Sequence, residues 1–128
     1  MKINSILIAN RGEIACRIIR TANEMGIKTI AVYEEADSNA TFVSMSDVAV
    51  KLRNGYLDAD EIVDAAKKTG ADAIHPGYGF LSENSIFARK VIRNNIIWIG
   101  PTPQVIKVMG DKIKAKELAI KANVPTLE

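Results

Sequence analysis

Short apolar runs alternate with amphipathic stretches along most of this chain, and that alternation limits the fold most strongly. Residues 6–9 form a continuous apolar run, which is typical of a strand buried on both faces. Residues 13–25 then repeat apolar side chains at helical spacing, and Gly26 is a helix stop. The same analysis predicts strands at 29–33, 48–50, 72–74 and 96–99, with helices at 60–68, 84–93 and 112–122. These βαβ units, joined by right-handed crossovers, predict an α/β, Rossmann-like three-layer domain with a parallel β-sheet flanked by helices.

The last predicted helix raises a question about its first turn. We expect Asp111 to cap this helix, Lys112 to stand in its first turn, and Asn123 and Pro125 to end it. The helix dipole disfavours a cation at that end, unless an anion is bound there as well. Charge alone favours a solvated basic face over a phosphate site.

Composition excludes several classes of protein. The chain has 128 residues, 48% of them hydrophobic, and a net charge of +2, which fits one globular domain and gives no basic surface for nucleic acid. No apolar run approaches the roughly 18 residues that a membrane helix needs. A single Cys excludes an internal disulfide, so we expect a reducing compartment, the cytoplasm or an interior such as the mitochondrial matrix.

Three segments follow predicted strands and therefore lie where open parallel sheets bind ligands: 10–13, 34–37 and 75–80. A dinucleotide site would need a Gly-x-Gly-x-x-Gly turn after the first strand, whereas that turn has one Gly and the bulky Arg11. Glu34 or Glu35 could bind a ribose. The sequence has the acidic residue of a dinucleotide site but lacks the glycine-rich turn, so a dinucleotide-binding module is a weak alternative.

The segment 75–80 concentrates unusual residues. It contains the only His of the chain, two of its eight Gly and one of its three Tyr. Gly77 and Gly79 allow a positive φ or the close approach of a ligand, and Tyr78 between them would be held out with its ring available for stacking. A tight turn with His75 hydrogen-bonded into the fold explains the composition equally well.

The first predicted helix carries a polar arc opposite its apolar stripe, formed by Cys16, Arg17, Arg20 and Glu24. It is either a solvated face or a partner surface, since Arg is enriched at interfaces. The sequence has no metal-ligand cluster, paired carboxylates, nucleophile elbow or Gly-rich phosphate loop. We therefore assign no catalytic residue and no metal ligand to this chain.

Four motifs, in this order, resemble the N-terminal (pre-ATP-grasp) domain of biotin carboxylase, the ATP-dependent component of acetyl-CoA, propionyl-CoA and pyruvate carboxylases. They are ILIANRGEIACRIIRTANEMGIKTIAVYEEAD, AIHPGYGFLSEN, IWIGP and MGDKIKAK, and the similarity covers essentially the whole chain. It implies a domain at 1–110, with 111–128 as the last helix and the start of a linker to an ATP-grasp domain absent here. Phe42 departs from the family, which usually has His there, and the loop near residues 53–56 is shorter than in the family.

The resemblance also implies roles for particular residues. The turn would border biotin and bicarbonate through His75, Gly77, Tyr78 and Gly79, and Lys112 would contact nucleotide phosphates. Arg17, Arg20 and Glu24 would lie at a homodimer interface.

The family reaction uses ATP, Mg²⁺ and bicarbonate to carboxylate biotin on a carrier protein. Domains missing here would bind most of these groups, so we expect the chain alone to be inactive. The expected partners are the remainder of the biotin carboxylase, the biotin carboxyl carrier protein and the carboxyltransferase, with no nucleic acid and no membrane. The alternative is a non-catalytic dimerisation or partner-binding module derived from a carboxylase.

Overall fold

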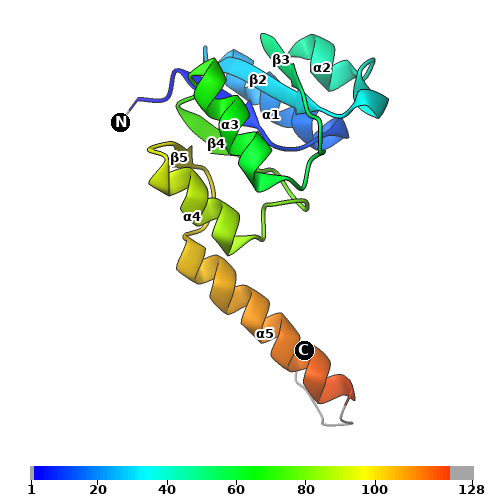
Figure 1. Ribbon diagram of the computed structural model, residues 1–128, viewed down its shortest axis with the longest axis vertical. Helices are drawn as coiled ribbons and strands as arrows, with labels where there is room; N and C mark the ends of the chain where they lie inside the picture. Colours follow the sequence, from blue (N-terminus) through cyan, green and yellow to red (C-terminus); the bar gives the residue numbers. More distant parts are fainter. Residues whose placement is uncertain (1, 122–128) are drawn as a thin grey trace.

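A computed structural model describes residues 2–121, which form a five-stranded parallel sheet in the order β3-β2-β1-β4-β5 (Figure 1). The strands are β1 Ser5–Ile8, β2 Lys28–Tyr33, β3 Val48–Lys51, β4 Ala73–His75 and β5 Ile97–Trp98. The helices are α1 Gly12–Glu24, α2 Thr41–Met45, α3 Ala59–Thr69, α4 Ser85–Arg93 and α5 Pro103–Lys121, with a short 3₁₀ turn, η1, at Glu35–Asp37. The predicted α/β class is confirmed.

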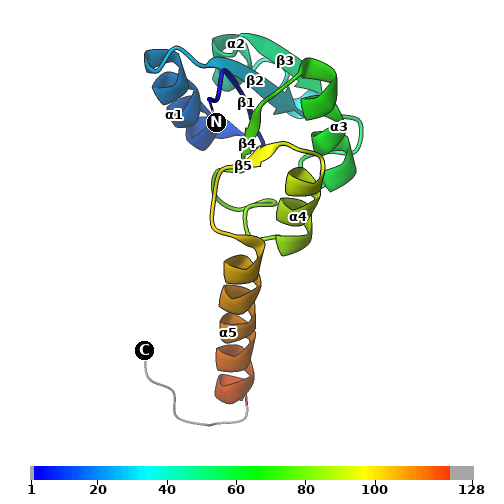
Figure 2. The same cartoon turned by 90° about the vertical axis from the view of Figure 1, so that its left-hand side faces the viewer.

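The sheet separates two helical layers (Figure 2). On one face α3 and α4 pack against a cluster that includes Leu7, Ile30, Ile74 and Phe87. On the other face α1 and α2 cover a second cluster around Ile8, Ile19 and Phe42. The strands of the centre are apolar on both faces because both faces are covered.

Side-chain caps define the ends of the helices. Asp58 accepts a hydrogen bond from the Glu61 amide and begins α3, while Asn84 accepts one from the Phe87 amide and begins α4. Asn95 follows α4 with φ of 60°, the left-handed conformation in which many helices end.

Helix α5 corrects the sequence prediction most. It begins at Pro103, with the Thr102 hydroxyl accepting from the Val105 amide at 3.2 Å, so Asp111 is not its cap. The start signal was a capping Thr followed by Pro at the first helical position. The helix continues through Gly110, which a long helix tolerates at a cost of about 1 kcal/mol. Lys112 therefore lies in mid-helix, away from the helix N-terminus; the predicted end at Asn123 and Pro125 lies outside the described residues.

Two side chains of α1 also lie elsewhere than predicted. Cys16 is buried in the α1 core cluster and is not part of the polar arc. Met25, which the helical pattern placed on the apolar side, is largely exposed. Phe42, the departure from the family pattern, is 1% exposed in the core beneath α2, where an aromatic ring packs without an unsatisfied polar atom.

Within residues 2–121, no helix has the length and apolar character that crossing a membrane would require.

Candidate functional site

The order of the strands locates the candidate site. β1 lies between β2 and β4. The strands β2 and β3 add to one side of β1, and the strands β4 and β5 add to its other side. The loops that leave β1 and β4 meet at this reversal, where the Ala9 amide donates to the His75 carbonyl at 2.9 Å. Open parallel sheets bind ligands at such a switch point.

Asn10 joins these two loops. Its side chain is 1% exposed, and its Nδ2 donates to the carbonyl oxygens of Pro76 at 2.9 Å and Tyr78 at 2.7 Å. Its Oδ1 accepts from the Arg11 amide at 2.8 Å. The sequence analysis assigned no specific role to Asn10, because its carbonyl partners lie 66 and 68 residues further along the chain.

The turn after β4 needs glycine at one position for two reasons. Gly77 has φ of 65°, and a Cβ there would lie 2.6 Å from Asn10 Nδ2 and 2.9 Å from Ile14 Cγ2. Gly79 has φ of 71° but open space around it. Phe80 also has a positive φ, 49°, although it is not a glycine. The prediction that Gly77 and Gly79 provide positive φ values is confirmed, and Phe80 is the residue of the turn whose φ is strained.

His75 and Tyr78 differ in burial and in hydrogen bonding. His75 Nδ1 accepts from the Gly77 amide at 3.0 Å, which requires the proton of the neutral ring to sit on Nε2. Burial lowers the pKa of His75, so the neutral ring is favoured. Tyr78 is 77% exposed. The bonded His75 and the outward Tyr78, which the sequence treated as alternatives, occur together.

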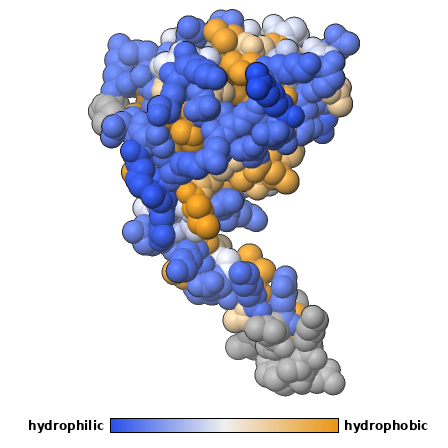
Figure 3. Space-filling view, viewed as in Figure 1, coloured by the Kyte–Doolittle hydropathy of each residue, from blue (hydrophilic) through white to orange (hydrophobic). Residues whose placement is uncertain are grey.

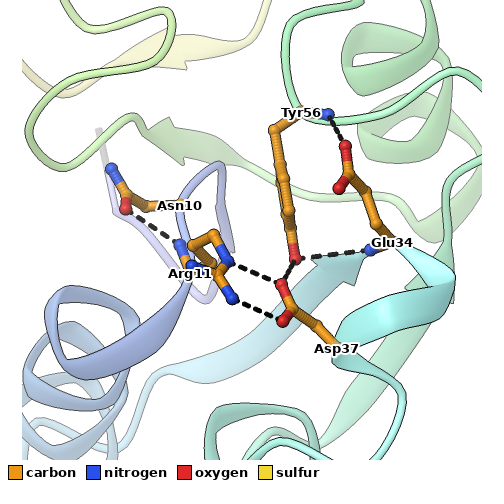
Figure 4. A network of polar contacts seen from close by, with 5 residues as sticks. All are labelled: Asn10, Arg11, Glu34, Asp37 and Tyr56. Atoms are coloured by element: carbon orange, nitrogen blue, oxygen red, sulfur yellow. Dashed lines mark hydrogen bonds and ion pairs between the residues drawn. The ribbon is translucent and has the colours of Figure 1, made fainter.

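A buried carboxylate ties two further loops to this edge of the sheet (Figure 4). Arg11 donates to Asp37 through Nε at 2.7 Å and through a terminal nitrogen at 2.6 Å. The Tyr56 hydroxyl donates to Asp37 at 2.6 Å and accepts from the Glu34 amide at 3.3 Å. Glu34 in turn accepts from the Tyr56 amide at 3.2 Å. These contacts link the loops after β1, β2 and β3.

The charges in this network stabilise one another. Hydrogen bonds from Arg11 and then Tyr56 lower the pKa of Asp37 to about 2. The same hydrogen bond to Asp37 raises the pKa of Arg11. Burial, and next the hydrogen bond to Asp37, raises the pKa of Tyr56. Asp37 is therefore ionised and Tyr56 protonated at neutral pH.

The Tyr56 ring connects this network to the turn 75–80 through a contact with Phe80. Its centroid lies 5.3 Å from that of Phe80, with the two planes tilted by 54°. The turn 75–80 is thus held near its start by Asn10 and at its end by Tyr56. The loops after β1, β2, β3 and β4 form one connected edge.

One of the predicted interface residues, Arg17, lies in a groove together with residues of the same turn. Arg17, Arg20 and Glu24 are exposed on α1, and Arg20 pairs with Glu13 at 3.1 Å, not with Glu24 four residues ahead. An apolar groove of about 510 Å³ runs along α1, lined by Ile14, Arg17, Ile18, His75, Tyr78 and Ile99 among others. The groove brings Arg17 together with two residues of the predicted site, although the sequence treated them separately.

Lys112 stands apart from this group. It is exposed halfway along α5, which projects away from the sheet (Figures 1 and 2). Among the described residues, no hydrogen bond joins Lys112 to the turn 75–80, and no group of three or more His, Cys, Asp or Glu could hold a metal ion. Lys112 is one of several exposed lysines on α5, with Lys107, Lys114 and Lys116, and the described residues contain no cluster of ligands for Mg²⁺.

Known proteins share both the sequence and the fold. The family model "Biotin carboxylase, N-terminal domain" matches residues 2–106. The alpha subunit of mitochondrial methylcrotonoyl-CoA carboxylase of Dictyostelium discoideum is 55% identical over 98% of the chain, and the propionyl-CoA carboxylase alpha chain of Ruegeria pomeroyi is 50% identical over 97%. The chain spans 19% of the length of each.

A solved structure gives the same result. It is the biotin carboxylase domain dimer of Hydrogenobacter thermophilus 2-oxoglutarate carboxylase, in complex with MgADP, ADP and bicarbonate. It superposes with a TM-score of 0.87 at 49% identity, covering 99% of this chain and 29% of that one. With the match to residues 2–106, these similarities establish that the chain belongs to the biotin carboxylase N-terminal domain family.

Proposed function

We propose that this chain acts as the N-terminal part of an ATP-dependent biotin carboxylase, in which the turn 75–80 borders the biotin and bicarbonate site. The observation that carries this proposal is the turn at the switch point, where Asn10 holds the backbone and Tyr78 remains exposed. The bicarbonate in the Hydrogenobacter structure supports the ligand class.

Each residue of the turn has a distinct proposed contribution. Tyr78 offers an exposed aromatic face on which the flat ureido ring of biotin stacks. Gly79 leaves its Cβ side open, which allows a ligand to approach the backbone. Gly77 and His75 keep the turn in shape through the bond between the Gly77 amide and the imidazole.

ATP and Mg²⁺ would be bound mainly outside this chain. Lys112 contributes a point charge to the nucleotide phosphates, without help from a helix N-terminus, because α5 starts at Pro103. ATP supplies the phosphoryl group that activates bicarbonate in the family. The proposed domain 1–110 and the segment 111–128, which leads to an ATP-grasp domain, share helix α5.

The surface supports a requirement for the remainder of a biotin carboxylase. In addition to the apolar groove along α1, helix α5 exposes a set of apolar side chains: Val105, Val108, Met109, Ile113 and Ile120. Figure 3 shows apolar patches among polar surface along this helix. Apolar surface of this extent is typical of an interface. Carrier protein and carboxyltransferase would complete the assembly. The proposed compartment is the cytoplasm or the mitochondrial matrix; the name of the Dictyostelium relative describes that protein as mitochondrial.

Arg17, Arg20 and Glu24 form the proposed homodimer surface. Charges of both signs on one exposed helix face suit a symmetric interface, in which the same patch meets itself. The alternative function, a non-catalytic module that pairs with a carboxylase subunit, is favoured by one observation: the groove adjoins Arg17 directly.

The test is phosphate release from MgATP in the presence of biotin and bicarbonate. We expect none from the chain alone, and release when it is mixed with a related biotin carboxylase from which the homologous region has been removed. Release that appears only in the mixture supports the proposal. Release by the chain alone, or none from a mixture in which binding is verified, contradicts it; in the second case the alternative module is favoured.

A further inference from the structure

We propose that Asn10 is a positioning residue for the turn 75–80, and that its side-chain amide sets where the exposed ring of Tyr78 stands. The use of that position by biotin rests on the function proposed above. The positioning itself is a property of this chain and can be measured without any catalysis.

The donors and acceptors around the Asn10 side chain match an amide. Both partners of Nδ2 are carbonyl oxygens, and the partner of Oδ1 is an amide N–H. A carboxylate of the same size would place an acceptor against two acceptors at a site that is 1% exposed. The site therefore requires a donor of amide geometry at this one atom.

The conformation of the turn supports the same role. Gly77 and Gly79 adopt positive φ values without a steric cost, whereas Phe80, with φ of 49°, is in a conformation that costs free energy for a residue with a side chain. Asn10 contacts the carbonyl groups on both sides of Gly77. A Cβ on Gly77 would lie 2.6 Å from Asn10 Nδ2, so the close contact between the amide and the backbone requires glycine at this position.

The exposure of Tyr78 makes its position depend on the backbone. Because 77% of the residue is exposed, few packing contacts hold its side chain, so the backbone of the turn sets the direction in which the Cα–Cβ bond points. The end of the turn is held separately: Arg11, next to Asn10, binds Asp37, which accepts from Tyr56, whose ring packs on Phe80. Two adjacent residues of one loop thus hold both ends of the turn, and Asn10 holds the part that carries Tyr78.

The experiment compares Asn10→Asp with Asn94→Asp in this chain. Asn94 is a matched control because its Nδ2 also donates to a backbone carbonyl, that of Lys90, at the end of α4. Both substitutions exchange one atom and both lower stability. We expect the amide NMR resonances of Gly77, Tyr78 and Gly79 to shift in Asn10→Asp only. Hydrogen exchange in the turn should accelerate by about tenfold or more relative to α3, since the loss of one hydrogen bond gives about tenfold and Asn10 Nδ2 makes two.

If Asn10→Asp does not fold, Asn10→Ala replaces it, because alanine removes the donor without burying a charge. Turn amides that keep their wild-type shifts and exchange rates in the folded variant would overturn the proposal. So would changes of equal size in the turn and in α3, since they would indicate a purely global role. The two proposals can fail separately. A carboxylase that is not complemented would leave the role of Asn10 intact, and unchanged turn amides would leave the proposed function intact.

Discussion

The turn 75–80 and helix α5 are both at the surface, yet they are held in different ways. The turn is fixed by contacts from the loops after β1 and β3, through Asn10 and Tyr56. Helix α5 is held at its start, where Pro103 and Ile106 are buried, and exposes apolar side chains further along. The turn is held by contacts within this chain, whereas α5 exposes apolar side chains that the rest of residues 2–121 does not cover.

The largest expected effect tests how tightly the turn is fixed. Gly77→Ala should lower the free energy of unfolding by about 2–4 kcal/mol, because it adds a clash with Asn10 and Ile14 to the cost of a positive φ. Gly79→Ala is the control and should cost about 1–2 kcal/mol, since it meets only the φ penalty. Urea denaturation measures both; equal losses would show that Asn10 does not confine the turn.

The next prediction concerns the Arg11–Asp37 pair. The pKa of Asp37 is lower in the folded chain, at about 2, than the ordinary 3.8, so the unfolded chain binds more protons below pH 4. The pair's contribution is thus fully present above pH 4 and is lost as the pH falls towards 2. We expect about 1–2 kcal/mol, reduced because the Arg11 side chain is half exposed.

Asp37→Asn provides the measurement for this pair. The difference in unfolding free energy between wild type and variant should be constant from pH 7 to about 4 and shrink below that. A difference independent of pH down to 2 would mean that the carboxylate charge contributes nothing.

The comparison also explains which features the sequence could predict. Strands 29–33 and 48–50 were identifiable because their apolar patterns are local, and the turn 75–80 because its unusual residues are adjacent. The Asp37 network was not, since Asp37 lies 26 residues from Arg11 and 19 from Tyr56, and only the fold brings them together. The start of α5 was missed because Gly110-Asp111 looked like a break followed by a cap, although Thr102-Pro103 carried the true signal.

A smaller effect separates the ring of Tyr56 from its hydroxyl. Tyr56→Phe should cost about 1 kcal/mol, because it removes the bond to Asp37 and the weaker bond from the Glu34 amide while leaving the ring to pack on Phe80. Tyr33→Phe, at a half-buried position on β2 with no recorded hydroxyl hydrogen bond among the described residues, should be neutral. Thermal unfolding of both variants measures this difference. An unchanged midpoint in Tyr56→Phe would show that the hydroxyl group does not stabilise the fold.

The smallest expected effect on this chain is at α5. Ile113 is 55% exposed, so Ile113→Gln should change the unfolding free energy by less than about 0.5 kcal/mol. The same substitution should weaken complementation with the remainder of a biotin carboxylase, because the proposed partner buries this face. Glu117→Gln is the control, a substitution at an exposed polar residue one turn further along α5. If Ile113→Gln destabilises the isolated chain as strongly as Gly79→Ala does, α5 is already packed within this chain and the contrast with the turn is wrong. If stability and complementation are both unchanged, the apolar face of α5 has no partner in the carboxylase, and the groove along α1 alone would have to carry the contact.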